Sequence, residues 1–225
     1  MRMLVSCLSA VLLVAVSTAS AAAPEPANDE QKTLYALGLV LSQSLNAFSL
    51  TEPELELVKA GLTDGVLKRP HKADLQTFGP KIQQLSQARG AVIAEAEKKT
   101  GASFVAKAAA ESGAKKTASG MIITTLKEGA GATPKATDKV KVHYHGTLID
   151  GTVFDSSVKR GEPVTFGLNQ VIPCWAEGVQ LIKVGGKSRL VCPANLAYGD
   201  RGAPPNIKPG ATLIFEVELL DIIKQ

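Results

Sequence analysis

The sequence contains few of the residues that usually perform catalysis or bind metals. It has three cysteines, three histidines and one tryptophan among 225 residues, and aromatic residues make up 4%. The histidines, His71, His143 and His145, show no ligand spacing that joins them to the cysteines, which argues against a zinc site. His143 and His145 lie two apart on one strand face, where surface histidines are the more common case without a third ligand. We therefore expect neither a bound metal nor a cofactor.

A concentrated basic surface is also missing. The net charge is +4, and the lysines and arginines are scattered along the chain instead of clustering on one face. Proteins that bind nucleic acids usually carry such a cluster. We therefore expect no nucleic-acid partner.

The apolar run at the N-terminus, residues 4–16, is too short to span a bilayer comfortably. Arg2 precedes it and the small residues 19–22 follow it, which is the pattern of a cleaved signal peptide. We expect residues 1–22 to be removed, leaving no stable membrane span. The protein is then exported, most simply to the periplasm, with outer-membrane association or secretion as alternatives. An uncleaved anchor is the weaker interpretation because the run is short and polar residues follow it.

Removal of this segment leaves two cysteines, Cys174 and Cys192, in a compartment that permits disulfides. A bond between them would close a short loop and stabilise the fold by about 3 kcal/mol in the loop-entropy account. The alternative is two small buried side chains that never meet. We predict the disulfide.

Residues 28–112 show the three- and four-residue spacing of amphipathic helices. Leucines from Leu34 to Leu45 predict a first helix, and Thr51-Glu52-Pro53-Glu54 has the form of a capping box at the start of a second. A third helix from Pro80 to the end of this region would be about 50 Å long. Pro80 must either begin this helix or kink it.

Two short helices cannot cover one long helix, so this region buries too little apolar surface to be stable as a monomer. We therefore predict that residues 28–112 form an arm through which the protein becomes a homodimer. The next segment, residues 113–120, begins and ends with glycine and contains two lysines, which predicts a linker into a second domain.

From residue 121 to residue 225 the pattern changes to that of strands. Val140, Val142 and Tyr144 alternate with polar residues, and Asp150-Gly151 is typical of the hairpin turn that follows. A short helix is expected around Trp175 and a long alternating strand near the C-terminus. The predicted fold class is α+β, an antiparallel sheet with one short helix lying across it, preceded by the all-α arm with its long helix.

Five motifs follow one another in this second domain. They are Val142-His143-Tyr144-His145-Gly146, Asp150-Gly151-Thr152-Val153-Phe154-Asp155-Ser156-Ser157, Val171-Ile172-Pro173-Cys174-Trp175, Leu196-Ala197-Tyr198-Gly199 and Thr212-Leu213-Ile214-Phe215. Each is weak alone, but in this order they closely resemble the FKBP-type peptidyl-prolyl cis-trans isomerases. The helical region resembles the dimerisation arm of the macrophage infectivity potentiator (Mip) subgroup, so the resemblance covers nearly the whole mature chain.

The resemblance implies an isomerase that accelerates proline-limited folding of exported proteins, with chaperone activity in addition. It also implies an FKBP-like sheet wrapped around a short helix, unfolded or proline-containing polypeptides as partners, and macrolides as inhibitors. No nucleophile is needed, because the barrier of about 20 kcal/mol arises from amide resonance. An apolar aromatic pocket that prefers the twisted amide lowers this barrier by differential binding and desolvation.

The resemblance further implies a role for individual residues. Trp175 forms the floor beneath the proline ring, while Tyr198 and the Ile172 N–H donate hydrogen bonds to the substrate. Asp155 is held by Tyr144 and Arg160 and faces the carbonyl of the twisting bond. It acts electrostatically, because bond rotation transfers no proton. The implied catalytic residues are Tyr144, Phe154, Asp155, Trp175 and Tyr198, and the implied substrate-binding residues are Val164, Phe166, Val171, Ile172, Ile207, Phe215 and Arg160.

Other interpretations of these residues remain open. Trp175, Phe166 and Phe215 are of the type that fills the core of a small α+β domain, and Asp155 also suits a turn. The same pocket would serve a module that binds proline-containing peptides, or a chaperone, without significant isomerase activity. Val164 stands where many relatives have an aromatic wall, which implies a more open pocket.

Overall fold

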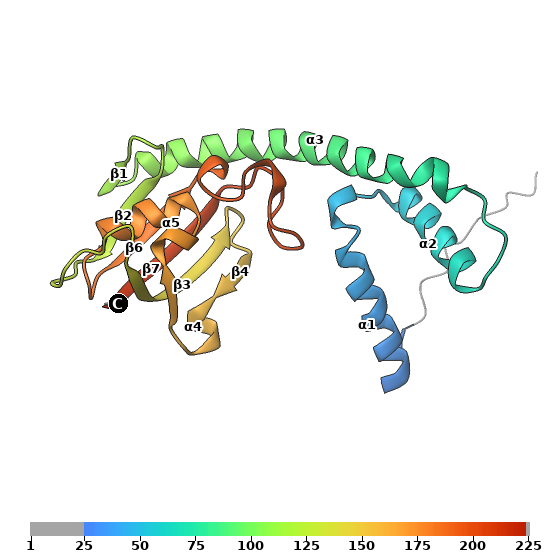
Figure 1. Ribbon diagram of the computed structural model, residues 1–225, viewed down its shortest axis with the longest axis horizontal. Coiled ribbons are helices and arrows are strands. Elements are labelled where there is room, and N and C mark those ends of the chain that lie inside the picture. The colour runs from blue at the N-terminus through green and yellow to red at the C-terminus, as the bar shows by residue number, and fades with distance from the viewer. Residues whose placement is uncertain (1–24, 224–225) are drawn as a thin grey trace, which may run out of the picture. The chain divides into compact units, whose positions relative to one another are not determined.

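The computed structural model describes residues 25–223, and its contacts divide the chain into two units, Met1–Leu39 and Val40–Gln225. The expected signal peptide, residues 1–22, lies outside the described residues. Four helices precede the sheet: α1 (Asp29–Gln43), the 3₁₀ helix η1 (Asn46–Phe48), α2 (Glu52–Val66) and α3 (Leu75–Ala109) (Figure 1). None of the helices within residues 25–223 combines the length and the hydropathy needed to cross a bilayer.

The predicted capping box fixes the start of α2. The Thr51 N–H donates to the Glu54 carboxylate over 2.9 Å, and Glu54 also accepts from Arg89 of α3. The same guanidinium donates to the Phe48 carbonyl oxygen of η1 over 2.7 Å. The Arg89 hydrogen bond, followed by those from Thr51, lowers the pKa of Glu54 to about 2. Arg89 therefore ties η1, α2 and α3 together, a contact that the sequence pattern did not indicate.

The long helix begins at Leu75, ahead of Pro80. The Asp74 carboxylate accepts from the N–H groups of Gln76 and Thr77 over 3.3 and 2.8 Å, which satisfies donors that a helix start leaves unpaired. Pro80 therefore does not begin the helix. The Asp74 cap sets the start, and the proline lies inside α3.

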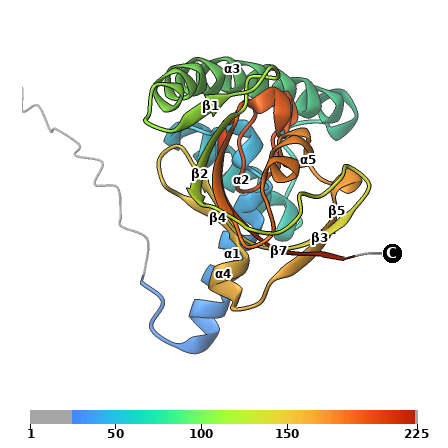
Figure 2. The same ribbon diagram turned by 90° about the vertical axis from the view of Figure 1, so that its left-hand side faces the viewer.

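Seven strands form one sheet in which every pairing is antiparallel, in keeping with the predicted α+β class (Figure 2). They are β1 (Ala114–Lys116), β2 (Ile122–Lys127), β3 (Lys139–Leu148), β4 (Val153–Ser156), β5 (Val164–Gly167), β6 (Lys187–Cys192) and β7 (Leu213–Ile223). The order is β1-β2-β6-β7-β3-β4, and β5 also pairs with β3. Strands β4 and β5 thus share one edge of β3, with α4 (Ser157–Arg160) between them in the chain.

The segment expected to be a linker contributes a strand to this sheet. Strand β1 pairs with β2, with Lys115 opposite Ile123. Three residues are too few to show the alternation of a strand, so this strand could not be predicted from pattern. The glycines at its ends, Gly113 and Gly120, have φ angles of 76° and 98° and form the turns. Three residues of the segment 113–120 are therefore part of the sheet, and the remainder connects them to α3 and β2.

Different helices cover the two faces of the sheet. On one face, α5 (Pro173–Gly178) belongs to the main core, whose buried strand residues include Val140, Val142, Tyr144, Leu190, Leu213, Phe215, Val217 and Leu219. On the other face, α3 packs on the alternate strand residues through Phe104, Val105 and Ala108, which join Ile122, Val191 and Ile214. One face of the C-terminal half of α3 therefore packs on the sheet of its own chain, a contact that the helical pattern of residues 28–112 did not indicate.

Candidate active site

Trp175 lies at the centre of an aromatic cluster and is only 4% exposed. Its ring meets Tyr144 of β3, Phe166 of β5 and Phe215 of β7, with centroid distances of 5.2, 5.6 and 5.3 Å. All three pairs are nearly perpendicular, the arrangement that aromatic quadrupoles favour. The indole Nε1 is buried and has no hydrogen-bond partner among residues 25–223.

The short helix α5 holds this ring in place. Ile172 is its N-cap, and the Ile172 carbonyl oxygen accepts from the N–H groups of Trp175 and Ala176 over 2.9 and 3.0 Å. Pro173 occupies the first turn, where a missing N–H costs nothing. The predicted helix around Trp175 is therefore present, although it is shorter than the run of apolar residues suggested.

Partly exposed side chains border the buried centre. Phe154 of β4 meets Phe215 edge to face at 5.5 Å, and Phe166 lies beside Tyr144 at 6.0 Å. Val164, Val171 and Ile172 are among the other partly buried residues that pack against this core. Trp175 and Phe215 are thus buried in the core, as the alternative interpretation held, whereas Phe166, the third residue that it named, is partly exposed. The cluster therefore reaches the surface through its border.

Two small residues that the sequence analysis gave no role shape this cluster. A Cβ atom on Gly146 would lie 2.7 Å from the ring of Phe154 and 3.1 Å from that of Phe215. The two rings can therefore pack directly against the backbone of β3 at Gly146 because this residue has no side chain. The Ser157 hydroxyl, fully buried, accepts from the Tyr144 N–H over 2.8 Å. A glycine inside the predicted strand 140–148 was the available sequence signal for the first of these contacts, because glycine in a strand often marks a close approach.

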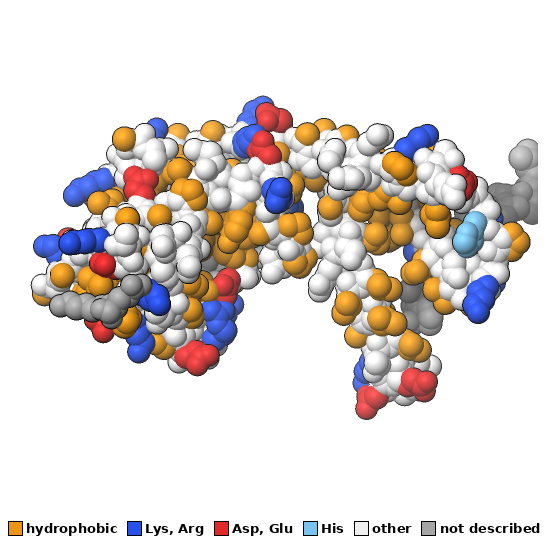
Figure 3. All heavy atoms as spheres, viewed as in Figure 1, with side chains coloured by type: hydrophobic (Ala, Val, Ile, Leu, Met, Phe, Trp, Pro, Cys, Tyr) orange, Lys and Arg blue, Asp and Glu red, His pale blue; other side chains and the backbone are white. Residues whose placement is uncertain are grey.

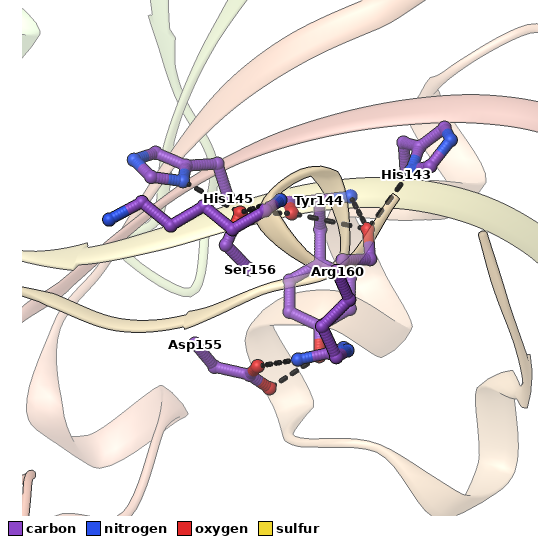
Figure 4. Close-up of polar contacts among 8 residues, drawn as sticks. His143, Tyr144, His145, Asp155, Ser156 and Arg160 are labelled. Atoms are coloured by element: carbon purple, nitrogen blue, oxygen red, sulfur yellow. Dashed lines mark hydrogen bonds and ion pairs between the residues drawn. The ribbon is translucent and has the colours of Figure 1, made fainter. Parts of the chain in front are cut away.

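Asp155, Tyr144 and Arg160 form one hydrogen-bonded network (Figure 4). The Tyr144 hydroxyl and the Arg160 guanidinium both donate to the Asp155 carboxylate, and Arg160 also donates to the Tyr144 hydroxyl oxygen over 3.0 Å. Pairing of β3 with β4 places Asp155 opposite Gly146, and α4 ends at Arg160. The fold thus brings three of the implied site residues together.

This network holds the carboxylate ionised. Partial burial raises the pKa of Asp155, but the hydrogen bonds from Tyr144 and Arg160 outweigh burial and leave the pKa below its ordinary value. Burial, followed by the hydrogen bond to Asp155, raises the pKa of Tyr144. At neutral pH the site therefore presents a fixed carboxylate and a protonated phenol, which supply a field but no base ready to take a proton.

The two neighbouring histidines lie on the other side of β3 from the Tyr144 ring (Figure 4). His143 Nδ1 is 3.2 Å from the Ser157 hydroxyl, and His145 Nδ1 is 2.9 Å from the Ser156 hydroxyl. Within residues 25–223, no group of three or more His, Cys, Asp or Glu side chains could hold a metal ion.

Cys174 and Cys192 form the predicted disulfide, with their Cα atoms 5.7 Å apart. Both residues are fully buried. The bond joins α5, one residue before Trp175, to the end of β6. It therefore braces the helix that carries the central indole.

Tyr198 and Ile207 lie on one loop, residues 198–210, which is called the Tyr198 loop below. Tyr198 is 42% exposed and caps the 3₁₀ helix η5 (Gly199–Arg201), whereas Ile207 is buried in the same core as Trp175. Ala203 and Ile207 exchange two backbone hydrogen bonds of 2.9 and 3.0 Å. The loop therefore carries one surface residue and one core residue of the implied site.

Comparison with known proteins gives matches over both halves of the chain. Residues 131–220 match the family described as FKBP-type peptidyl-prolyl cis-trans isomerase, and residues 30–122 match the domain described as amino terminal to it. An FKBP-type peptidyl-prolyl cis-trans isomerase FkpA from Aeromonas hydrophila is 44% identical over 92% of this chain and 81% of its own length. Outer membrane protein MIP from Legionella longbeachae is 34% identical over 96% of both chains.

A solved structure agrees with these matches. The crystal structure of FkpA from Escherichia coli is similar with a TM-score of 0.65 and 38% sequence identity, over 87% of this chain and 97% of that chain. Sequence and fold thus agree along almost the whole length, and they confirm the resemblance drawn from the five motifs. The chain belongs to the FKBP-type peptidyl-prolyl cis-trans isomerases.

Proposed function

We propose that the protein accelerates cis–trans isomerisation of X–Pro bonds in exported polypeptides, and that the aromatic cluster around Trp175 is where this happens. The observation that supports the site is the joint placement of a buried indole, a partly exposed apolar border and one ionised carboxylate. A proline ring would lie over the indole, between Phe154, Phe166 and Ile172.

Isomerisation of an X–Pro bond requires little more than such an apolar environment. Rotation about the amide bond must overcome its resonance, and no bond is broken and no proton moves. In the twisted amide the carbonyl carries less charge separation than in the planar one. An apolar surface therefore disfavours the planar ground state relative to the transition state and lowers the barrier.

The polar groups orient the bound peptide and stabilise the charge distribution of its twisted amide. Asp155, held by Tyr144 and Arg160, directs a fixed negative charge toward the carbonyl carbon of the twisting bond. The Ile172 N–H precedes the first helical hydrogen bond of α5, so it is available to a substrate carbonyl. Tyr198, on the exposed loop, supplies a second donor from its hydroxyl.

We further propose that the protein is a homodimer joined through its helical arm, with chaperone activity. No residue of α1 is buried, and large apolar side chains are exposed on α1, α2 and α3 (Figure 3). They include Leu34, Leu37, Leu41, Leu55, Leu62, Leu75, Phe78, Ile82 and Leu85. So much exposed apolar surface favours burial against a second chain or an unfolded client.

The periplasm is the proposed location, with macrolides as proposed ligands of the aromatic site. The N-terminal pattern of residues 1–22 supports export, and the buried disulfide suits an oxidising compartment. An assay in membrane and soluble fractions of the native host would separate free periplasmic protein from protein bound to the outer membrane.

A protease-free proline isomerisation assay with wild type, Asp155→Ala and Asp150→Ala tests the site. Asp150 lies in the nearby hairpin turn and accepts from the Thr152 N–H over 2.9 Å, so its removal also deletes a carboxylate but outside the cluster. We expect kcat/KM of Asp155→Ala to fall by at least about tenfold, which is about 1.4 kcal/mol of transition-state stabilisation. Asp150→Ala should match wild type.

The same assay separates the enzyme from a binding module. If wild type leaves the rate unchanged from that without protein but still binds a proline-containing peptide, the binding module is the better account. If Asp155→Ala keeps full activity, the carboxylate has no part in catalysis and the proposed site loses its polar component.

A further inference from the structure

The Tyr198 loop rests on the long helix α3 through two ion pairs. Lys98 Nζ of α3 lies 2.7 Å from an Asp200 carboxylate oxygen, and Lys208 Nζ of the loop lies 3.4 Å from a Glu97 carboxylate oxygen. The hydrogen bond from Asp200 is the main cause of a raised pKa of Lys98. Figure 1 shows this loop, in orange-red before β7, directly beside α3.

The loop backbone also touches α3 where no side chain would fit. A Cβ atom on Gly210 would lie 2.4 Å from the Ala94 carbonyl oxygen, and Ala94 is only 2% exposed. Pro209 lies against Gly90 of the same helix, with a ring carbon 3.9 Å from where a Cβ atom would stand. Gly90 and Ala94 are four residues apart, so they present one face of α3 to the end of the loop.

A shift of the loop backbone at Gly210 would also shift the backbone at Tyr198. The Gly210 N–H donates to the Gly199 carbonyl oxygen over 2.9 Å, next to Tyr198. The Gly202 N–H donates to the Tyr198 carbonyl oxygen over 3.2 Å. Because the loop is closed on itself by these bonds, Gly210 cannot move away from α3 without moving the backbone that carries Tyr198.

The middle of the loop has little other support near α3. Pro204 and Pro205 line a cavity of about 960 Å³ together with Ile93 of α3 and with Leu45. Ile207 anchors the loop in the main core, and α3 contacts the loop near its two ends, at Asp200 and Gly210. A segment beside open space depends on such contacts for a fixed position.

We propose that α3 is a positioning element of the isomerase, in which Ala94 and Lys98 hold the Tyr198 loop in the conformation that contacts the polypeptide. The inference rests on the proposed location of the substrate site. Ala94 acts through the steric fit with Gly210, and Lys98 acts through its ion pair with Asp200. The helix that joins the arm to the sheet therefore also sets how well the site holds its substrate.

The steric contact is tested with Gly210→Ala against Gly113→Ala in the full-length protein. Both glycines have a φ of 76°, but an added Cβ meets nothing within 4 Å at Gly113. The two variants therefore share the backbone strain, and only Gly210→Ala pushes the loop from α3. We expect Gly210→Ala to raise KM for a proline-containing peptide several-fold with little change in kcat, and Gly113→Ala to keep the wild-type KM.

The ion pair is tested with Lys98→Ala. This variant tests the positioning role of α3 even if Gly210→Ala does not fold. Lys59→Ala is the control, because Lys59 makes a surface pair with Glu56 of the same 2.7 Å length on α2. We expect Lys98→Ala to raise KM about twofold, the size typical of a half-exposed pair. Raising the salt to about 1 M, where the screening length is about 3 Å, should bring the KM of wild type toward that of Lys98→Ala.

The outcomes separate the positioning role from the site itself. If Asp155→Ala loses activity but Gly210→Ala and Lys98→Ala keep the KM of their controls, the positioning role of α3 is overturned and the site stands. If wild type itself does not accelerate isomerisation, the proposed site falls and the positioning role falls with it.

Discussion

The helical arm exposes the same kinds of apolar residue that the sheet buries. Leu34 of α1 is 61% exposed, whereas Leu213 and Val217 of β7 are fully buried. The difference lies in layering: the sheet has α5 on one face and α3 on the other, but the described arm covers little of its own apolar surface. The sheet is therefore the part that is stable by its own contacts, and the arm is the part for which we propose association with a second chain.

Introducing a carboxylate into each region tests this contrast most severely. Val217→Asp places a charge where the side chain is fully buried, so we expect the sheet to lose several kcal/mol and to unfold under mild conditions. Leu62→Asp, at a 52% exposed position of α2, should leave the sheet folded but weaken the dimer. Fluorescence of the single tryptophan follows the sheet, and sedimentation velocity follows the dimer.

This contrast fails if the two substitutions have the same effect. A wild-type protein that sediments as a monomer would show that the exposed leucines serve something other than dimerisation. A Val217→Asp variant with the unfolding midpoint of wild type would show that the sheet core is not what stabilises the domain.

The disulfide should matter to one region alone. Replacing both Cys174 and Cys192 by alanine opens a loop with a sequence separation of 18 and should cost about 3 kcal/mol of unfolding free energy. Because Trp175 follows Cys174, isomerase activity should fall as well, while the dimer stays intact. Urea unfolding with and without reductant, on wild type and the double variant, measures this effect. Unequal unfolding of the two proteins under reducing conditions would assign the loss to packing instead of the bond.

Replacing a glycine by alanine should change the free energy of unfolding in opposite directions in the two regions. Gly146→Ala puts a Cβ atom 2.7 Å from the Phe154 ring, which should destabilise the sheet by about 1–3 kcal/mol and lower activity. Gly61→Ala in α2 meets nothing within 4 Å, and alanine should stabilise this helix by up to about 1 kcal/mol. Thermal unfolding of both variants decides the sign. A stabilised Gly146→Ala would show that the rings can move aside.

The sequence could predict what depends on local pattern. Helical spacing and the capping box located α2, and the alternation of Val140, Val142 and Tyr144 located β3 and its buried face. The start of α3 stayed open between two alternatives, because a proline can begin a helix or kink one, and the pattern did not single out the Asp74 cap that sets the start. The strand β1 was missed because its three residues are stabilised by the partner strand rather than by their own preference.

For the candidate site, too, local pattern predicted the residues but not all of their contacts. The motifs led to the residues, and sequence reasoning from the family placed Asp155 beside Tyr144 and Arg160, as the structure has them. No pattern could show that Ser157 would meet the Tyr144 N–H, or that α3 would reach Asp200 and Gly210. Those contacts join segments far apart in the chain, and they are set by how the sheet and the helix pack.

The smallest expected effect is the pH dependence of the sheet region through Asp155. Burial opposes ionisation of this carboxyl, but hydrogen bonds from Tyr144 and Arg160 leave its pKa lower than in the unfolded chain. Its stabilising contribution is therefore complete above the unfolded value, about 3.9, and is lost as the pH falls through the still lower folded value. Because the carboxylate is partly exposed, the change in stability should be small. We expect kcat/KM to stay level from neutral pH down to about pH 5, whereas a decline centred near pH 6 would show that another group controls the reaction.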